Sequence, residues 1–120
     1  MDYMNKMNID FVESLYKSII VEHMELYENI FNTVVHENMP EYRKKTLEFY
    51  NNLSQENKEV LMGLLKQSMI NAISNLLGII DGSSTLNDCD LEPKLLLDNK
   101  DTENELQDTF LAYIEENHMK

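Results

Sequence analysis

Cysteine, glycine, proline and basic residues are all scarce in this sequence, and each scarcity excludes a class of protein. The single cysteine, Cys89, rules out an intramolecular disulfide framework and any zinc site built from several cysteines. Three glycines and two prolines are too few for a β-sandwich or barrel with many tight turns. Lysine and arginine number 10 against 22 acidic residues, so the net charge is −12. Without a basic surface, direct binding to DNA, RNA or an anionic membrane is not expected.

Long hydrophobic segments are also missing. The N-terminal residues contain no unbroken apolar run behind a basic stretch, so they do not predict a secretory signal. The most apolar window, 60–80, contains Lys66 and several amide and hydroxyl groups that a membrane span would have to desolvate. We therefore expect a cytoplasmic protein. Its many asparagines, isoleucines and lysines are typical of an AT-rich bacterial or phage genome.

Helical periodicity in four segments predicts an all-α fold, a single-domain bundle of about four helices spanning 1–120. The first helix is expected over about 10–38, and its stripe contains Val12, Tyr16, Ile19, His23, Tyr27, Ile30 and Val34. Asn38-Met39-Pro40 should end it, because proline restricts the residue before it. A short second helix is expected over about 40–52, with an apolar side made of Tyr42, Thr46, Phe49, Tyr50 and Leu53.

The third predicted helix begins after Ser54, a good N-cap, and stops at Asp81-Gly82. It has no charged residue between Gln67 and Ile80, which predicts a buried, central helix. The polar segment that follows contains the apolar run 94–98, which fits a short strand or hairpin, a helical turn or a loop pinned to the core. The last helix is expected from about Thr102, with Thr102 or Asp101 as its cap and a frayed end over 117–120.

No pattern in the sequence predicts catalysis, a metal or a cofactor. A di-iron bundle needs two inward Glu-x-x-His pairs, and only Glu115…His118 is present. The segment 81–92 superficially resembles a calcium loop, but Leu86 stands where its sharp turn needs glycine. Cys89 lies between Asp88 and Asp90, whose negative charges disfavour a reactive thiolate. We therefore expect that the protein is not an enzyme.

The negative charge is concentrated in the last third of the chain. Residues 1–80 carry a net charge of −4 and residues 81–120 a net charge of −8. Carboxylates on a loop held by a rigid bundle can steer a basic protein toward the molecule and raise its association rate. We expect a basic protein partner, with the partner-binding candidates Asp88, Asp90, Glu92, Asp98, Asp101, Glu103, Glu105 and Asp108.

In size, acidity and helical build the chain resembles the small acidic helical immunity proteins that bacteria encode to neutralise toxins. Three stretches are also similar to small uncharacterised bacterial proteins: 76–84 (LLGIIDGSS), 95–98 (LLLD) and 106–110 (LQDTF). The first resemblance implies a non-enzymatic inhibitor that binds a basic toxin or nuclease. It supplies no individual functional residue, and the eight candidates above rest on charge density alone.

The sequence also allows two alternative functions. One is a structural or regulatory helical protein that homodimerises through an apolar face. The other is a small-ligand-binding bundle or enzyme built around His23, Tyr27 and Tyr50, which requires a cleft with converging polar groups. The oligomeric state in solution and the surroundings of these three side chains distinguish the alternatives.

Overall fold

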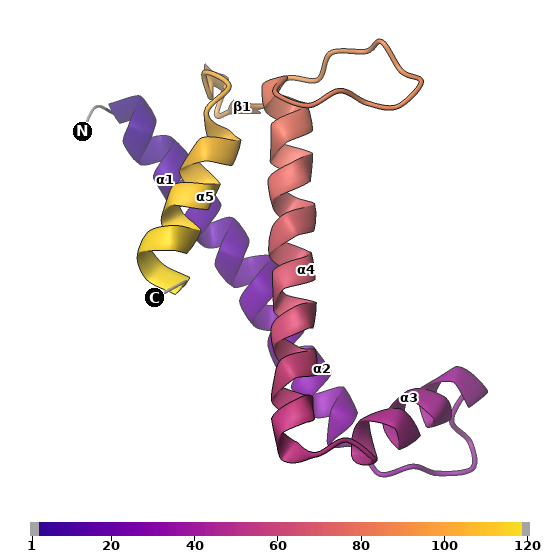
Figure 1. Cartoon of the computed structure of the whole chain (residues 1–120). Helices are drawn as coiled ribbons and strands as arrows, with labels where there is room; N and C mark the ends of the chain where they lie inside the picture. Colours follow the sequence, from indigo (N-terminus) through magenta and orange to yellow (C-terminus); the bar gives the residue numbers. More distant parts are fainter. Residues whose placement is uncertain (1–2, 119–120) are drawn as a thin grey trace.

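The computed structural model describes residues 3–118 and confirms the all-α prediction (Figure 1). A continuous helical rod is formed by α1 (Tyr3–Leu15), the π-helical segment η1 (Tyr16–Val21) and α2 (Glu22–Phe31). Three further helices follow, with a two-stranded antiparallel hairpin before the last: α3 (Glu41–Asn51), α4 (Gln55–Asp81), β1 (Leu96–Leu97), β2 (Lys100–Asp101) and α5 (Leu106–His118). Within the described residues, no helix combines the length and hydropathy that crossing a membrane requires.

The π-helical segment changes which residues of the rod face inward. A π-turn holds more residues than an α-turn, so it shifts the apolar stripe along the sequence. Beyond Tyr16 the inward positions are Ile20, Met24 and Phe31. The prediction that His23 lies on the inner stripe is therefore wrong. His23 is exposed, and its ring Nδ1 lies 2.7 Å from the Ile19 carbonyl oxygen.

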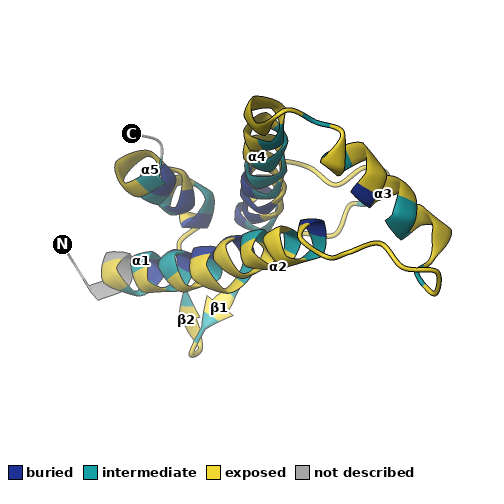
Figure 2. Cartoon of the chain, turned by 90° about the horizontal axis from the view of Figure 1, so that it is seen from below, coloured by how far each residue is buried: buried dark blue, intermediate teal, exposed yellow. Residues whose placement is uncertain are grey.

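The core lies where the rod, α4 and α5 pack together. In Figure 1, the rod runs obliquely to α4 and meets it along η1 and α2, while α5 packs against α1 and α4. Figure 2 shows the buried residues on the inward faces of these helices. Phe110 of α5 is fully buried at the centre of this cluster. The other buried members are Val12, Tyr16, Ile20, Ile70, Ile73, Leu77, Leu106 and Ile114.

The rod ends earlier than the sequence predicts. It stops at Phe31, and the predicted stripe residue Val34 is 82% exposed in the loop that follows. The β-branched run 33–35 has low helix propensity, which explains the early end. In α3 the buried residue is Leu47, whereas Tyr42 and Phe49, predicted on the apolar side, are exposed. Tyr50 stacks on Phe31 with ring centroids 4.2 Å apart and joins α3 to the rod.

Both predicted ends of α4 are confirmed, but its predicted burial is not. Ser54 Oγ accepts a hydrogen bond from the Asn57 amide at 3.1 Å, and Gly82 adopts the left-handed conformation at φ 85°. Ile70, Ile73 and Leu77 face the core, yet Val60, Leu64 and Leu76 are exposed. The rod and α5 cover one face of α4, and no other described element covers the opposite one.

Candidate protein-binding surface

The eight predicted acidic residues lie at the end of the molecule where α4 finishes. They occupy the 82–95 loop, the hairpin and the start of α5, which Figure 1 shows at the same end. Seven of the eight are exposed, and Asp101 is half-buried. We call this region (residues 88–108) the acidic end. It contains eight carboxylates and two lysines, so its net charge is −6.

The loop carboxylates line a groove beyond the C-terminus of α4. Asp88, Asp90 and Glu92 border this groove of about 730 Å³, together with Ile79 and Ile80. Asp88 adopts a positive φ of 57°, a conformation that aspartate tolerates better than most residues. The lining of this groove therefore combines apolar and acidic side chains.

The hairpin presents a second group of carboxylates, and one of them is neutralised within the chain. Lys94 Nζ lies 2.8 Å from Asp101 Oδ2. This hydrogen-bonded pair lowers the pKa of Asp101 and raises that of Lys94, although both groups remain exposed enough for water to screen them. Asp98 stands on the two-residue turn between the strands, at a positive φ of 51°. Asp98 is thus better placed than Asp101 to meet an external cation.

The hairpin is anchored to the rod through one buried hydrogen bond. Asn8, which is 1% exposed, donates from Nδ2 to the Thr102 carbonyl oxygen at 3.0 Å. Thr102 Oγ1 in turn donates to the Leu95 carbonyl oxygen at 3.2 Å. These bonds fix the position from which Asp98 and Glu103 project. They also explain why Thr102 does not cap the last helix as predicted.

Glu105 and Asp108 face a different groove, between α1 and α5. This groove of about 710 Å³ is also lined by Glu13 and Glu116. Tyr113 borders it, and burial together with the negative charge of Glu13 raises the pKa of its phenol. Glu13 is paired with Lys17 at 3.0 Å. Five of the eight predicted residues therefore line two separate grooves, and the other three, Asp98, Asp101 and Glu103, lie on or beside the hairpin.

Sequence reasoning missed two residues of this second groove. Glu116 follows Glu105 and Asp108 at helical spacing, so the stripe on one face of α5 could have revealed it. Glu13 lies on α1, almost a hundred residues earlier in the chain, and only the packing of α1 against α5 brings it into the groove.

The end of α4 is tied to the start of α5 by polar contacts that the sequence did not reveal. The Gln107 backbone amide donates to Asp81 Oδ2 at 2.7 Å, so α5 is capped from α4 and not by Asp101 or Thr102. The Gln107 side chain donates to the Ser74 carbonyl oxygen at 3.0 Å and accepts from Ser83 Oγ at 2.8 Å. The residues Asp81, Ser83 and Gln107 belong to the stretches LLGIIDGSS and LQDTF. Their contacts give these stretches a structural role.

His23, Tyr27 and Tyr50 do not line either of the two grooves described above. Tyr27 and Tyr50 both stack against Phe31. Of the segment 117–120 that was predicted to fray, Asn117 and His118 are helical and residues 119 and 120 lie outside the described part of the chain. The His118 ring stacks on Tyr16 at 4.0 Å between centroids. Burial lowers the pKa of His118, and the charge of Lys66 lowers it further. Among the described residues, no group of three or more His, Cys, Asp or Glu side chains is arranged to hold a metal ion.

No protein-family model, no curated protein and no solved structure matches this chain.

Proposed function

We propose that the protein is a non-enzymatic binding module that presents its acidic end to a basic protein. The observation that carries this proposal is the exposure of seven of the eight carboxylates at one end of the molecule. Charge of one sign on an anchored surface raises the association rate with an oppositely charged partner and suppresses binding to like-charged proteins. A cationic toxin or nuclease is the partner class this surface fits best, which makes an immunity-type inhibitor the leading interpretation.

The structure sharpens the choice of residues for a test. Reversing Asp101 would also break its pair with Lys94, so its effect would mix binding with hairpin stability. Asp98, Glu105 and Asp108 are exposed, and they sample both the hairpin and the α1–α5 groove. A matched control is the reversal of three exposed glutamates of α2: Glu22, Glu25 and Glu28.

Proteins that the wild-type chain captures from a lysate of its source cell can be identified by mass spectrometry. Wild type and the α2 control should retain the same basic protein, whereas D98K/E105K/D108K should lose it. Each lost charge contact at a protein interface changes affinity by about 1 kcal/mol or more, so the triple variant should bind at least about a hundredfold more weakly. Retention of that partner by the triple variant, or in about 1 M NaCl, would contradict the proposal.

A further inference from the structure

The chain is far more extended than a compact monomer of its size. Its radius of gyration is 18.2 Å, whereas about 14 Å is expected for 120 residues. Its accessible surface is 8589 Å², whereas a compact protein of 14.1 kDa exposes about 6,700 Å². The chain's own elements thus leave about 1,900 Å² more surface exposed than usual.

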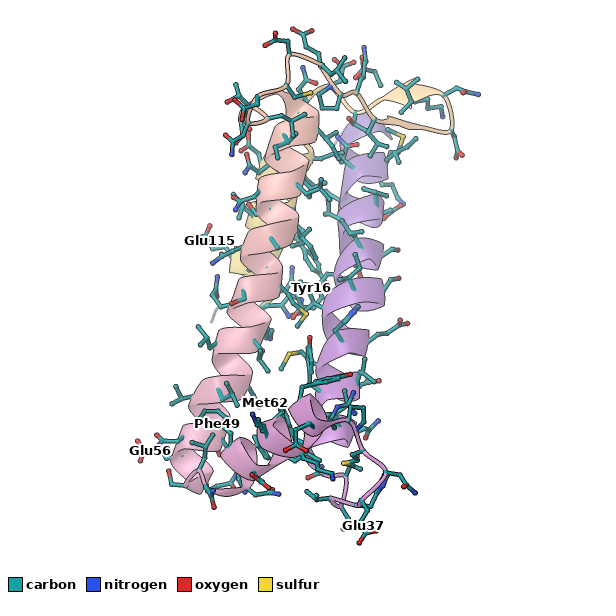
Figure 3. The ribbon with its side chains drawn as sticks, turned by 90° about the vertical axis from the view of Figure 1, so that its right-hand side faces the viewer. Tyr16, Glu37, Phe49, Glu56, Met62 and Glu115 are labelled. Atoms are coloured by element: carbon teal, nitrogen blue, oxygen red, sulfur yellow. The ribbon has the colours of Figure 1, made fainter. Side chains whose placement is uncertain are left out.

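Part of this excess lies on the uncovered face of α4. In Figure 3, α4 runs in front between the loop at one end and α3 at the other, and no element lies over it. Val60 is 64% exposed and Leu64 is 61% exposed. Gln67 and Asn71 follow at steps of three and four residues, the spacing of a helix–helix contact line. We call Val60, Leu64, Gln67 and Asn71 the α4 seam.

The seam differs in charge from the rest of this acidic protein. Every exposed residue of α4 from Val60 onward is uncharged: Val60, Gly63, Leu64, Gln67, Ser68, Asn71, Ala72, Asn75 and Leu76. A basic partner has no carboxylate to meet here and would be drawn to the acidic end. Two copies with a net charge of −12 each repel one another less where the contacting surfaces carry no charge. The chemistry of the seam therefore fits a second copy of this chain.

We propose that two copies form a symmetric dimer by packing their α4 seams together. A standard interface buries about 800 Å² per partner, and the exposed face of α4 contributes only part of the surface excess of the whole chain. Gln67 Nε2 donates to Asn71 Oδ1 at 3.0 Å, while Gln67 Oε1 and Asn71 Nδ2 take no part in that bond and can pair across a two-fold axis. Polar side chains at such positions fix the register of paired helices.

Gly63 leaves room for a helix of a second copy to approach α4 closely beside the seam. A glycine inside a helix is unfavourable relative to alanine, and a Cβ added here would meet no atom of the chain within 4 Å. Packing within one chain therefore gives no reason for a glycine at this position. A second helix that approaches closely beside Leu64 supplies one.

The test is the mass in solution, measured by light scattering and sedimentation equilibrium across concentrations up to about 100 µM. Wild type should show twice the 14.1 kDa mass of one chain. Leu64→Glu should raise the dimer dissociation constant at least about tenfold, because it places a carboxylate in the seam. The matched control is Leu76→Glu on the same helix, where the leucine is 56% exposed but lies about 120° around the axis from Leu64.

Asn71→Lys provides a second seam variant at an exposed position, and circular dichroism verifies that each variant folds. Dimer loss in both seam variants, with the Leu76→Glu protein still dimeric, would support the proposal. A monomeric wild type would overturn it and leave the seam to another partner or to none. Equal dissociation by Leu64→Glu and Leu76→Glu would also overturn it, because the contact would then not follow the seam.

Discussion

Gln107 is the residue that couples the longest helix to the acidic end. Its backbone amide is satisfied by Asp81, and its side chain bridges the Ser74 carbonyl and the Ser83 hydroxyl. Removing one partner of a buried or half-buried hydrogen bond leaves the other polar group unsatisfied, which strongly destabilises the fold. The orientation of α5, and with it the direction in which Glu105 and Asp108 project, therefore depends on this side chain.

Gly78→Ala provides a direct probe of this coupling. The added Cβ would lie 2.7 Å from Gln107 Nε2, so the amide would have to move away from Ser74. Alanine normally stabilises a helix interior by about 0.5–1 kcal/mol over glycine, but here we expect a loss of about 1–2 kcal/mol. Urea unfolding followed by circular dichroism measures the difference.

The control is the same Gly78→Ala substitution made in a Gln107→Ala protein, which lacks the side chain that clashes. In that background, Gly78→Ala should become neutral or stabilising, because only helix propensity remains. An equal loss of stability in both backgrounds would show that the clash with Gln107 is not the cause.

The sequence predicted which carboxylates are candidates for binding, but not their neighbours. Charge density identified the carboxylates of the acidic end because surface charges need no partner to remain exposed. It did not reveal that Lys94 neutralises Asp101, or that Glu13 joins Glu105 and Asp108. Both facts depend on the path of the backbone, which charge density does not encode.

Among the elements, those with local capping signals were predicted best. Ser54 and Gly82 act through atoms a few residues away, so their patterns placed both ends of α4 correctly. The start of α5 was placed too early because its cap, Asp81, comes from another helix. The π-helical segment η1 carries no glycine or proline, and it moved His23 off the inner face without a sequence signal.

The turn of the hairpin requires two residues with positive φ. Asp98 and Asn99 form its two-residue turn with φ values of 51° and 66°, the geometry of a type I′ turn. Asn99→Ala should destabilise the hairpin by about 1 kcal/mol, because a residue with a plain Cβ is strained at positive φ. Asn99→Gly, the control, should leave the hairpin at least as stable.

Hydrogen exchange of the amides in 96–101 measures this local stability without requiring global unfolding. Faster exchange in Asn99→Ala alone is the expected result. Unchanged exchange in both variants would mean that the bonds of Thr102 to Asn8 and Leu95, and not the turn, hold the hairpin in place.

The acidic surface and the proposed dimer contact lie on different parts of the molecule. The sequence presented an acidic binding surface and a homodimer as alternatives. The structure places the acidic end beyond the C-terminus of α4, whereas the seam lies on Val60 to Asn71 of the same helix. A dimer formed through the seam would leave both acidic ends accessible, so each surface can be tested in the presence of the other.

Salt concentration should act on the two surfaces with opposite signs. Raising NaCl from 0.1 to 1 M shortens the Debye length from about 10 Å to about 3 Å. Screening weakens the repulsion between two chains of charge −12, so the dimer dissociation constant should fall as salt rises. Binding of a basic protein to the acidic end should weaken over the same range, because its attraction is screened.

Sedimentation equilibrium across this range measures the first effect, and titration with the captured basic partner measures the second. The Leu64→Glu variant is the control for dimerisation. Salt should also screen the repulsion between the two carboxylates that this substitution places in the seam, so its dimer dissociation constant should fall as well. A wild-type dimer that dissociates in high salt would mean that its contacts are ion pairs. Such contacts cannot come from an exposed α4 face that carries no charge from Val60 onward, and the interface would have to lie elsewhere on the molecule.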